Sequence, residues 1–290
     1  MNHQQAIAHK ARNQLQTALI IVAMSLLLAL SSRLLFGPDL WLWLMAGFVA
    51  IMLLLPAASP VWLLRMYRAR MLDSRVAPRL HSLVDELAHR AGLPSSPALF
   101  LLPGRGLNAF AVGNREQSAI AVTEGLLATL PWREINGVLA HEISHIRNND
   151  LRIMTLADMM TRFTQTLSTT ALIMLLLLTP FVLLGEIDIS IVGLLTLVMT
   201  PAVNVLMQLG LSRLREFDAD LDAARLTGDP EGLASALARI ERIAVNPWQR
   251  MFGLPRRDDP PMMLRSHPST RERIQRLLSL RRPWINQPRF

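Results

Sequence analysis

The sequence predicts an α+β fold: a multi-span helical membrane protein joined to polar segments that are mostly α-helical and contain a small β-sheet. Two observations carry this prediction. Hydrophobic residues make up 51% of the 290 residues and charged residues only 18%, which is too apolar for an ordinary soluble domain. Four apolar stretches are each long enough to cross a bilayer, which requires about 20 helical residues.

The expected spans cover residues 17–36, 40–64, 167–184 and 189–211. Basic residues flank the ends that precede the first and third spans and follow the second and fourth, whereas the turns within each pair carry few. By the positive-inside rule, both termini and the polar segments face the cytosol. An alternative makes residues 17–30 a cleaved signal peptide with a small-residue site at Ala29-Leu30-Ser31. The second span and its arginines would halt export, so we expect the first span to be retained.

This pattern divides the chain into four parts: an N-terminal membrane hairpin at 1–70, a polar part at 71–165, a second hairpin at 166–211 and a final polar part at 212–290. The net charge of +8 raises the possibility of nucleic-acid binding. The arginines are scattered or lie beside apolar spans, and only 6% of residues are aromatic, so stacking platforms for bases are lacking. We therefore expect a lipid bilayer as the surrounding medium and no nucleic-acid partner.

The polar parts contain helices and short strands. Residues 78–91 have the apolar spacing of an amphipathic helix, and 98–102, 108–112 and 118–122 are β-favouring runs, with a hairpin turn at Gly113-Asn114. In the final part we expect a helix from Asp229-Pro230, an irregular stretch at 246–261, and a last helix with a capping box of Ser269 and Glu272.

A possible metal site lies in a predicted helix at 131–147, which reads His141-Glu142-Ile143-Ser144-His145. The two histidines are one turn apart and about 40° around the axis, so both imidazoles can reach one metal ion. Glu142 projects beside them, where its carboxylate can take a proton from a metal-activated water and pass it to a leaving amine. The chain has no cysteine, so the remaining ligand must be His, Asp or Glu. The pattern predicts a zinc peptidase site.

A catalytic zinc requires a third protein ligand, and elimination points to the acidic cluster after the fourth span. We expect Asp150 to interact with the end of its own helix rather than with the metal. Glu216 and Asp220 are four residues apart and share a helical face, which suits a metal ligand and a carboxylate that orients a histidine ring. The alternative is an acidic, solvated helix face.

These residues resemble the bacterial heat-shock membrane protease family HtpX, which is related to the CAAX prenyl protease. The resemblance rests on the HExxH run with Asp150, on residues 212–220 (SRLREFDAD), on residues 108–113 (NAFAVG), and on Ser266-His267-Pro268 followed by Arg273. It covers nearly the whole chain. The sequence departs from better-known members in a short turn between the third and fourth spans, in Phe217, and in an arginine-rich C-terminus.

The resemblance implies a gluzincin-like catalytic fold with one Zn²⁺ per chain, His141, His145 and Glu216 as metal ligands, and Glu142 as general base. It also implies a multi-pass protein of the bacterial inner membrane whose active site faces the cytosol. Its substrates would be unfolded or damaged membrane proteins, aligned along an edge strand formed by Asn108, Ala109, Phe110 and Ala111. Any partner among other membrane proteases is not specified by the sequence.

Two further residues are candidates for stabilising the negative charge that develops on the substrate carbonyl oxygen. His267 lies at a rigid His-Pro step, and Arg273 follows in the last predicted helix. Their alternative role is to brace the site. For the protein as a whole, the alternatives to quality control are a dedicated processing peptidase and a non-catalytic scaffold that uses zinc for folding. Glu142 argues against the scaffold, because a structural zinc site has no use for a general base.

Overall fold

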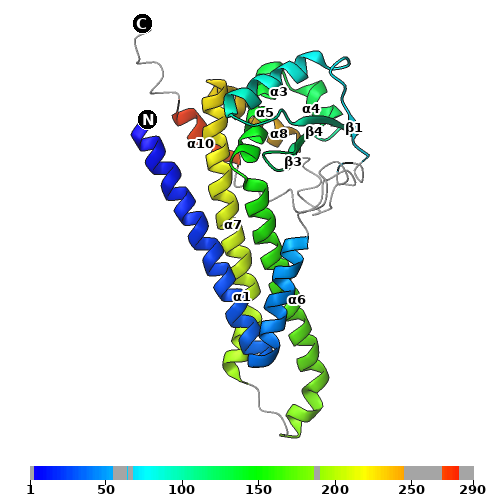
Figure 1. Ribbon diagram of the computed structural model, residues 1–290, viewed down its shortest axis with the longest axis vertical. Coiled ribbons are helices and arrows are strands. Elements are labelled where there is room, and N and C mark those ends of the chain that lie inside the picture. The colour runs from blue at the N-terminus through cyan, green and yellow to red at the C-terminus, as the bar shows by residue number, and fades with distance from the viewer. Residues whose placement is uncertain (1–2, 55–63, 65–67, 186–189, 245–269, 281–290) are drawn as a thin grey trace. The chain divides into compact units, whose positions relative to one another are not determined.

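The computed structural model describes residues 3–54, 64, 68–185, 190–244 and 270–280 (Figure 1). The chain forms two compact units. The sheet unit comprises Ala58–Arg152 and Arg213–Phe290, and the apolar unit comprises Asn2–Ala57 and Ile153–Ser212. The apolar unit thus consists of two separate stretches of chain, and the sheet unit consists of the two stretches that follow them.

The first hairpin of the apolar unit is formed by α1 (His3–Leu54), which reverses direction at Gly37 (Figure 1). Gly37 has φ 80°, a conformation that glycine adopts without the steric penalty of a Cβ atom. The arm Ala11–Gly37 is long and apolar enough to cross a membrane, whereas the described part of the second arm, Asp39–Ile51, is shorter than a full span. Pro56 and Pro60, in the rest of the second predicted span, lie outside the described residues.

The second hairpin is formed by α6 (Asp150–Leu183) and α7 (Ile191–Thr227), both long and apolar enough to span a membrane. Each helix extends beyond the predicted span, because no glycine or proline interrupts the helical pattern in the adjoining polar residues. Polar contacts link the two helices: the Asn204 amide donates to Thr164 Oγ1 over 2.7 Å, and the Gln208 amide donates to Asp158 over 3.3 Å. Such contacts hold helices in register where lipid offers no hydrogen bonds.

The sheet unit contains four strands in the order β1-β2-β4-β3. They are β1 (Arg70–Met71), β2 (Ala98–Leu102), β3 (Ala109–Gly113) and β4 (Ser118–Thr123). β2 and β4 are parallel, and the other two pairs are antiparallel. The three predicted strands are found within a residue of their expected ends. β1 was not predicted, because two residues are too few to show a periodicity.

The β3–β4 turn confirms the predicted hairpin. Asn114 Oδ1 accepts hydrogen bonds from the backbone N–H groups of Glu116 and Gln117, and Gly113 has φ 100°. β3 lies at the edge of the sheet, as expected for the segment at 108–113. One long side of β3 is therefore not paired with another strand of the described sheet.

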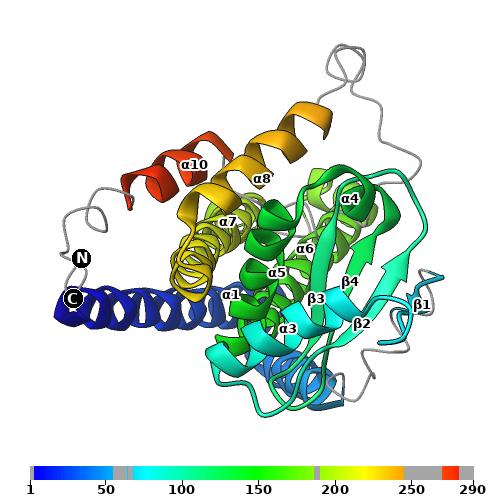
Figure 2. The same cartoon turned by 90° about the horizontal axis from the view of Figure 1, so that it is seen from above.

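The sheet unit also contains helices that pack in layers outward from one face of the sheet. They are α3 (Pro78–Ala91), α4 (Glu124–Thr129), α5 (Trp132–Arg147), α8 (Pro230–Ala244) and α10 (Thr270–Ser279). Figure 2 shows α5 between the sheet and α8, with α3 beside it and α10 next to α8. Gly137 permits the close contact of α5 with α8, since a Cβ atom there would lie 2.9 Å from the backbone of Leu233. This packing buries α5 on nearly all sides.

The predicted helices at 78–91 and 131–147 are confirmed, the second beginning one residue later. α8 begins directly after Asp229, whose carboxylate accepts the backbone N–H of Gly232 and so caps the helix. The last predicted helix is also found, from Thr270. Its expected cap residue Ser269 and the irregular stretch at 246–261 lie outside the described residues.

Candidate metal centre

Three side chains of the sheet unit converge on one point: His141 and His145 from the C-terminal half of α5, and Glu216 from α7. The two Nε2 atoms lie 3.1 Å apart. Glu216 places one carboxylate oxygen 3.4 Å from His141 Nε2 and the other 3.6 Å from His145 Nε2. Within the described residues these three form the only group of this kind with metal-ligand chemistry.

The spacing of these atoms fits zinc. Tetrahedral zinc has bonds of about 2.0–2.1 Å to nitrogen or oxygen, so neighbouring ligand atoms are about 3.3–3.4 Å apart. The two Nε2 atoms, 3.1 Å apart, are close to that value, and each lies near one of the two oxygens of Glu216, at 3.4 and 3.6 Å. With three protein ligands, a tetrahedral ion keeps one position for water or substrate. The donor set, two imidazoles and a carboxylate, therefore suits a catalytic metal.

A carboxylate contacts the other ring nitrogen of each histidine. Asp220 Oδ1 lies 3.1 Å from His141 Nδ1, as the shared helical face of Glu216 and Asp220 predicted. Asp150 Oδ2 lies 2.9 Å from His145 Nδ1. Each contact leaves Nε2 directed at the ligand cluster, the arrangement by which neighbouring carboxylates orient metal-binding imidazoles.

The position of Asp150 differs from the expectation. Asp150 is not at the end of the histidine helix but is the first residue of α6, from which it reaches back to His145. Periodicity does not reveal this contact, because the two-residue break at Asn148 and Asn149 sets the direction of α6. The spacing of five residues after His145 was the only signal in the sequence.

Arg273, on α10, brings a positive charge to the cluster. Its Nε and NH2 groups donate to the two oxygens of Asp220 over 2.8 and 2.7 Å, and NH1 lies 2.9 Å from Glu216 Oε2. NH2 is also 3.3 Å from His141 Nε2. The side chain is only 4% exposed, so this buried cation balances two buried carboxylates. The other oxyanion candidate, His267, lies outside the described residues.

Glu142 points toward the edge strand. Its Oε2 atom accepts a hydrogen bond from the backbone N–H of Ala111 over 3.0 Å. Asn108 is bonded instead to the neighbouring strand, where its C=O accepts the N–H of Thr123. Backbone groups alternate in an antiparallel pair, so Ala109 and Ala111 direct theirs away from β4, toward the side where Glu142 lies. Phe110 is buried under the sheet with Phe100.

The charges around the two histidines alter their protonation. Burial and the positive charge of Arg273 lower the pKa of His141, but hydrogen bonds to Asp220 and Glu216 outweigh both and raise it to about 10. Burial likewise lowers the pKa of His145, and the hydrogen bond to Asp150 reverses the shift, so that its pKa lies above the usual value. In the absence of a metal, the cluster therefore favours protonated imidazole, and a metal ion must displace those protons.

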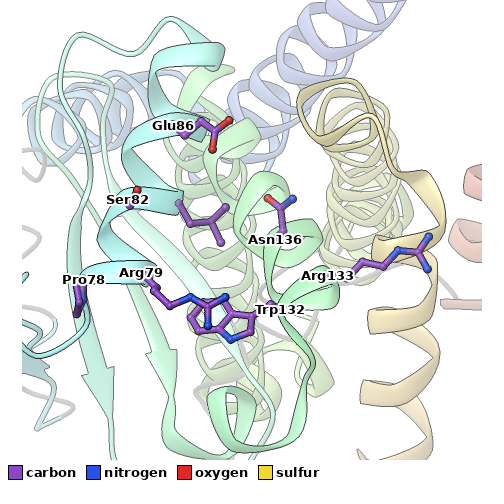
Figure 3. Close-up of a pocket in the computed structure, with 8 residues that line it drawn as sticks. Pro78, Arg79, Ser82, Glu86, Trp132, Arg133 and Asn136 are labelled. Carbon is purple, nitrogen blue, oxygen red and sulfur yellow. The ribbon is translucent and has the colours of Figure 1, made fainter.

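A separate hollow lies between α3 and the first turns of α5 (Figure 3). Its lining includes Arg79, whose guanidinium lies 4.6 Å from the ring centroid of Trp132, and Glu86. His141 is five residues beyond Asn136, the lining residue nearest to it along α5, which corresponds to about 1.4 helical turns. The hollow contains none of the predicted site residues.

Comparison with known proteins identifies the family of this chain. The model of peptidase family M48 matches residues 74–281. A protease HtpX homolog from Acaryochloris marina is 36% identical over 95% of this chain and 97% of its own length. One from Burkholderia multivorans is 35% identical over 77% of this chain and 81% of its own length. The crystal structure of S. mikatae Ste24p shares the fold, with a TM-score of 0.53 at 21% identity, over 93% of this chain and 67% of that chain.

Proposed function

Because the chain belongs to peptidase family M48, within its HtpX-like group of membrane metalloproteases, we propose that it hydrolyses peptide bonds of misfolded or damaged membrane proteins. The metal is one Zn²⁺ per chain, held by His141, His145 and Glu216. The observation that carries this proposal is the convergence of two imidazole Nε2 atoms and one carboxylate, whose ligand atoms all lie within 4.8 Å of one another.

The chemistry divides between the metal and Glu142. Zinc in this site would lower the pKa of water and attract the carbonyl oxygen of the substrate. Glu142 is the general base: its carboxylate accepts the proton of the attacking water and then donates it to the nitrogen of the leaving amine. The Ala111 N–H donates a hydrogen bond to Oε2 of Glu142. This contact orients the carboxylate through a neutral donor.

The edge strand β3 aligns the substrate. An extended peptide that pairs with the N–H and C=O of Ala109 and with the C=O of Ala111, whose N–H is bonded to Glu142, forms main-chain hydrogen bonds regardless of its side chains. Its scissile bond would then pass beside Glu142, which contacts the same strand. Recognition through the backbone suits a protease for unfolded segments, because such segments expose strand-forming backbone whatever their sequence. A dedicated processing peptidase would require side-chain pockets in addition.

The protein lies in the bacterial inner membrane with the metal centre in the cytosol. This orientation rests on the arginines that flank the apolar helices, among them Arg152 on α6 and Arg213 on α7.

The test is a set of variants assayed for metal content and for cleavage of unfolded membrane and soluble proteins. We expect His141→Ala, His145→Ala and Glu216→Ala to lose both zinc and activity, and Glu142→Gln to keep zinc but lose activity. His89→Ala, an exposed histidine on α3, is the matched control and should resemble wild type. Full zinc occupancy in Glu216→Ala would refute the ligand set, and cleavage confined to one defined tail would replace quality control by processing.

A further inference from the structure

The buried carboxylate of Asp150 contacts His145 in a fixed geometry, although Asp150 has no part in the proposed proton transfers. Asp150 is 1% exposed, and its two oxygens have different partners. Oδ2 lies 2.9 Å from His145 Nδ1, and Oδ1 lies 3.2 Å from NH1 of Arg215. One oxygen thus faces the proposed ligand, and the other faces a cation. A carboxylate divided in this way constrains the imidazole ring in both direction and distance.

The backbone is arranged to bring Asp150 back toward His145. Asn149 has φ 56°, one of two positive φ values among the described residues other than glycine. This left-handed conformation costs most residues roughly 1–2 kcal/mol, and asparagine tolerates it better than most. The preceding Asn148 donates its side-chain amide to Asp222 of α7 over 2.9 Å, which fixes the end of α5. The break between α5 and α6 is therefore fixed by the contact of Asn148 before it and by the contacts of Asp150 after it.

Arg215 offsets the electrostatic cost of burying the Asp150 carboxylate. An isolated buried carboxylate loses its hydration, and only a partner of opposite charge with good geometry offsets that loss. Arg215, 5% exposed, contacts Asp150 and also donates to Asp218 Oδ2 over 2.7 Å. Because Arg215 immediately precedes Glu216 on α7, the helix that supplies the third ligand also supplies the counter-charge for Asp150. The position of Glu216 and the position of Asp150, which contacts His145, therefore both depend on α7.

We propose that Asp150, balanced by Arg215, is the positioning residue for His145: it holds the Nδ1 proton and directs Nε2 at the metal. This inference rests on the proposed function in one respect, that His145 is a metal ligand. Asp150 in this role corresponds to Asp220 on the other histidine, so each imidazole is held by a carboxylate from a different helix. The predicted effect of losing Asp150 is therefore on metal affinity before it is on folding.

The first measurement is the zinc affinity of the full-length purified protein, by competition with a chelator, together with the rate at which zinc is lost. We expect Asp150→Ala to weaken binding by roughly 10- to 100-fold, as loss of such supporting groups usually does. The zinc affinity of Asp150→Asn should lie between those of Asp150→Ala and wild type, since the asparagine amide oxygen still accepts a hydrogen bond from His145 Nδ1. Glu134→Gln is the matched control: it breaks a buried carboxylate–arginine pair with Arg239 at the other end of α5. It should lower the melting temperature without changing zinc affinity.

Asp150→Ala leaves Arg215 without this partner and can impair folding, so a second variant separates the two effects. The triple variant Asp150→Ala/Arg215→Met/Asp218→Asn removes Arg215 together with the charges of both carboxylates that it contacts. It should regain thermal stability, because apolar or neutral replacement of a buried ion group is often neutral. We expect its zinc affinity to stay low. If the triple variant regains both stability and zinc affinity, or if Asp150→Ala binds zinc like wild type, the positioning role is overturned. If His145→Ala keeps full zinc, the ligand assignment fails instead, which is a separate result.

Discussion

At the scale of single residues, the centre is governed by charge balance. Two carboxylates, Glu216 and Asp220, lie within contact distance of His141, and Arg273 lies against all three. In the metal-free protein the protonated imidazole and the guanidinium supply the positive charge that the carboxylates require. A bound divalent cation would supply the same charge. Protons, Arg273 and metal therefore compete for the same carboxylates, and pH and substitution have predictable effects.

Zinc binding should strengthen as pH rises. Hydrogen bonds to Asp220 and Glu216 raise the pKa of His141 from its ordinary value of 6.5 to about 10, so at neutral pH the metal-free imidazole carries a proton that zinc must displace. We expect the apparent dissociation constant to fall roughly tenfold per pH unit for each proton released, between about pH 6.5 and 8. The stability of the metal-free protein should fall as pH rises. The stabilisation that protonated His141 contributes is complete below pH 6.5 and is lost as pH rises toward about 10. An affinity independent of pH in this window would contradict the proton count.

The variant Arg273→Ala distinguishes two roles of Arg273: balancing the charges of Asp220 and Glu216, or stabilising the oxyanion of the substrate. If Arg273 balances Asp220 and Glu216, its loss destabilises the metal-free protein by about 3–5 kcal/mol, as expected for breaking a buried pair. Saturating zinc should restore part of that loss, because the metal replaces the missing charge. Thermal unfolding with and without zinc measures both. A turnover rate lowered roughly 10- to 1,000-fold, with unchanged stability and zinc content, would instead identify an oxyanion donor. That second pattern is what we expect for His267→Ala.

At the scale of secondary-structure elements, the important relation is between β3 and α5. The edge strand and the HExxH helix are joined by the bond from the Ala111 N–H to Glu142. The general base is thus held by the strand that we propose pairs with substrate. A peptide added to that edge would be placed relative to the base by one short, direct contact.

Ala109→Pro tests this strand. Its N–H points away from β4, so proline removes a donor from the substrate side while the β3–β4 ladder keeps its bonds. We expect KM for unfolded substrates to rise several-fold, with zinc content and melting temperature near wild type. Ala109→Val, which keeps the N–H, is the control and should bind substrate far better than the proline variant. Equal KM values in the two variants would argue against strand pairing.

At the scale of the whole molecule, the chain alternates between an apolar unit and a polar unit. α6 and α7 belong to both, since each begins or ends in the sheet unit and continues through an apolar stretch. Asp150 and Glu216 are therefore carried by the same two helices that we expect to cross the membrane. The orientation of these helices determines on which side of the membrane peptides are cleaved.

Topology can be measured with single cysteines, since the native chain has none. We expect a cysteine at Ser279, in the last turn of α10, to be protected from a membrane-impermeant thiol reagent in intact cells. A cysteine at Ile187, which follows α6 and precedes α7 in the sequence and lies outside the described residues, should react. Permeabilised cells are the control, where both should be labelled. The reverse pattern would place the metal centre outside the cytosol.

The sequence by itself determined the features that depend on local spacing. Helical periodicity predicted α3 and α5, and the interval between His141 and His145 placed both on one turn of helix. Elimination led to the acidic cluster, the four-residue spacing and the family resemblance led to Glu216 and Asp220, and the structure brings both to His141. The helical spacing follows from the pitch of the helix alone.

Only the tertiary structure decided what depends on how elements meet. The contact of Asp150 with His145 requires the turn at Asn149, and the placement of Arg273 on Asp220 joins residues of two different helices. Likewise, the bond between Ala111 and Glu142 depends on β3 occupying the sheet edge beside α5. Such contacts arise from packing and from the balance of buried charge, which join residues far apart in the chain and leave no periodic pattern in the sequence.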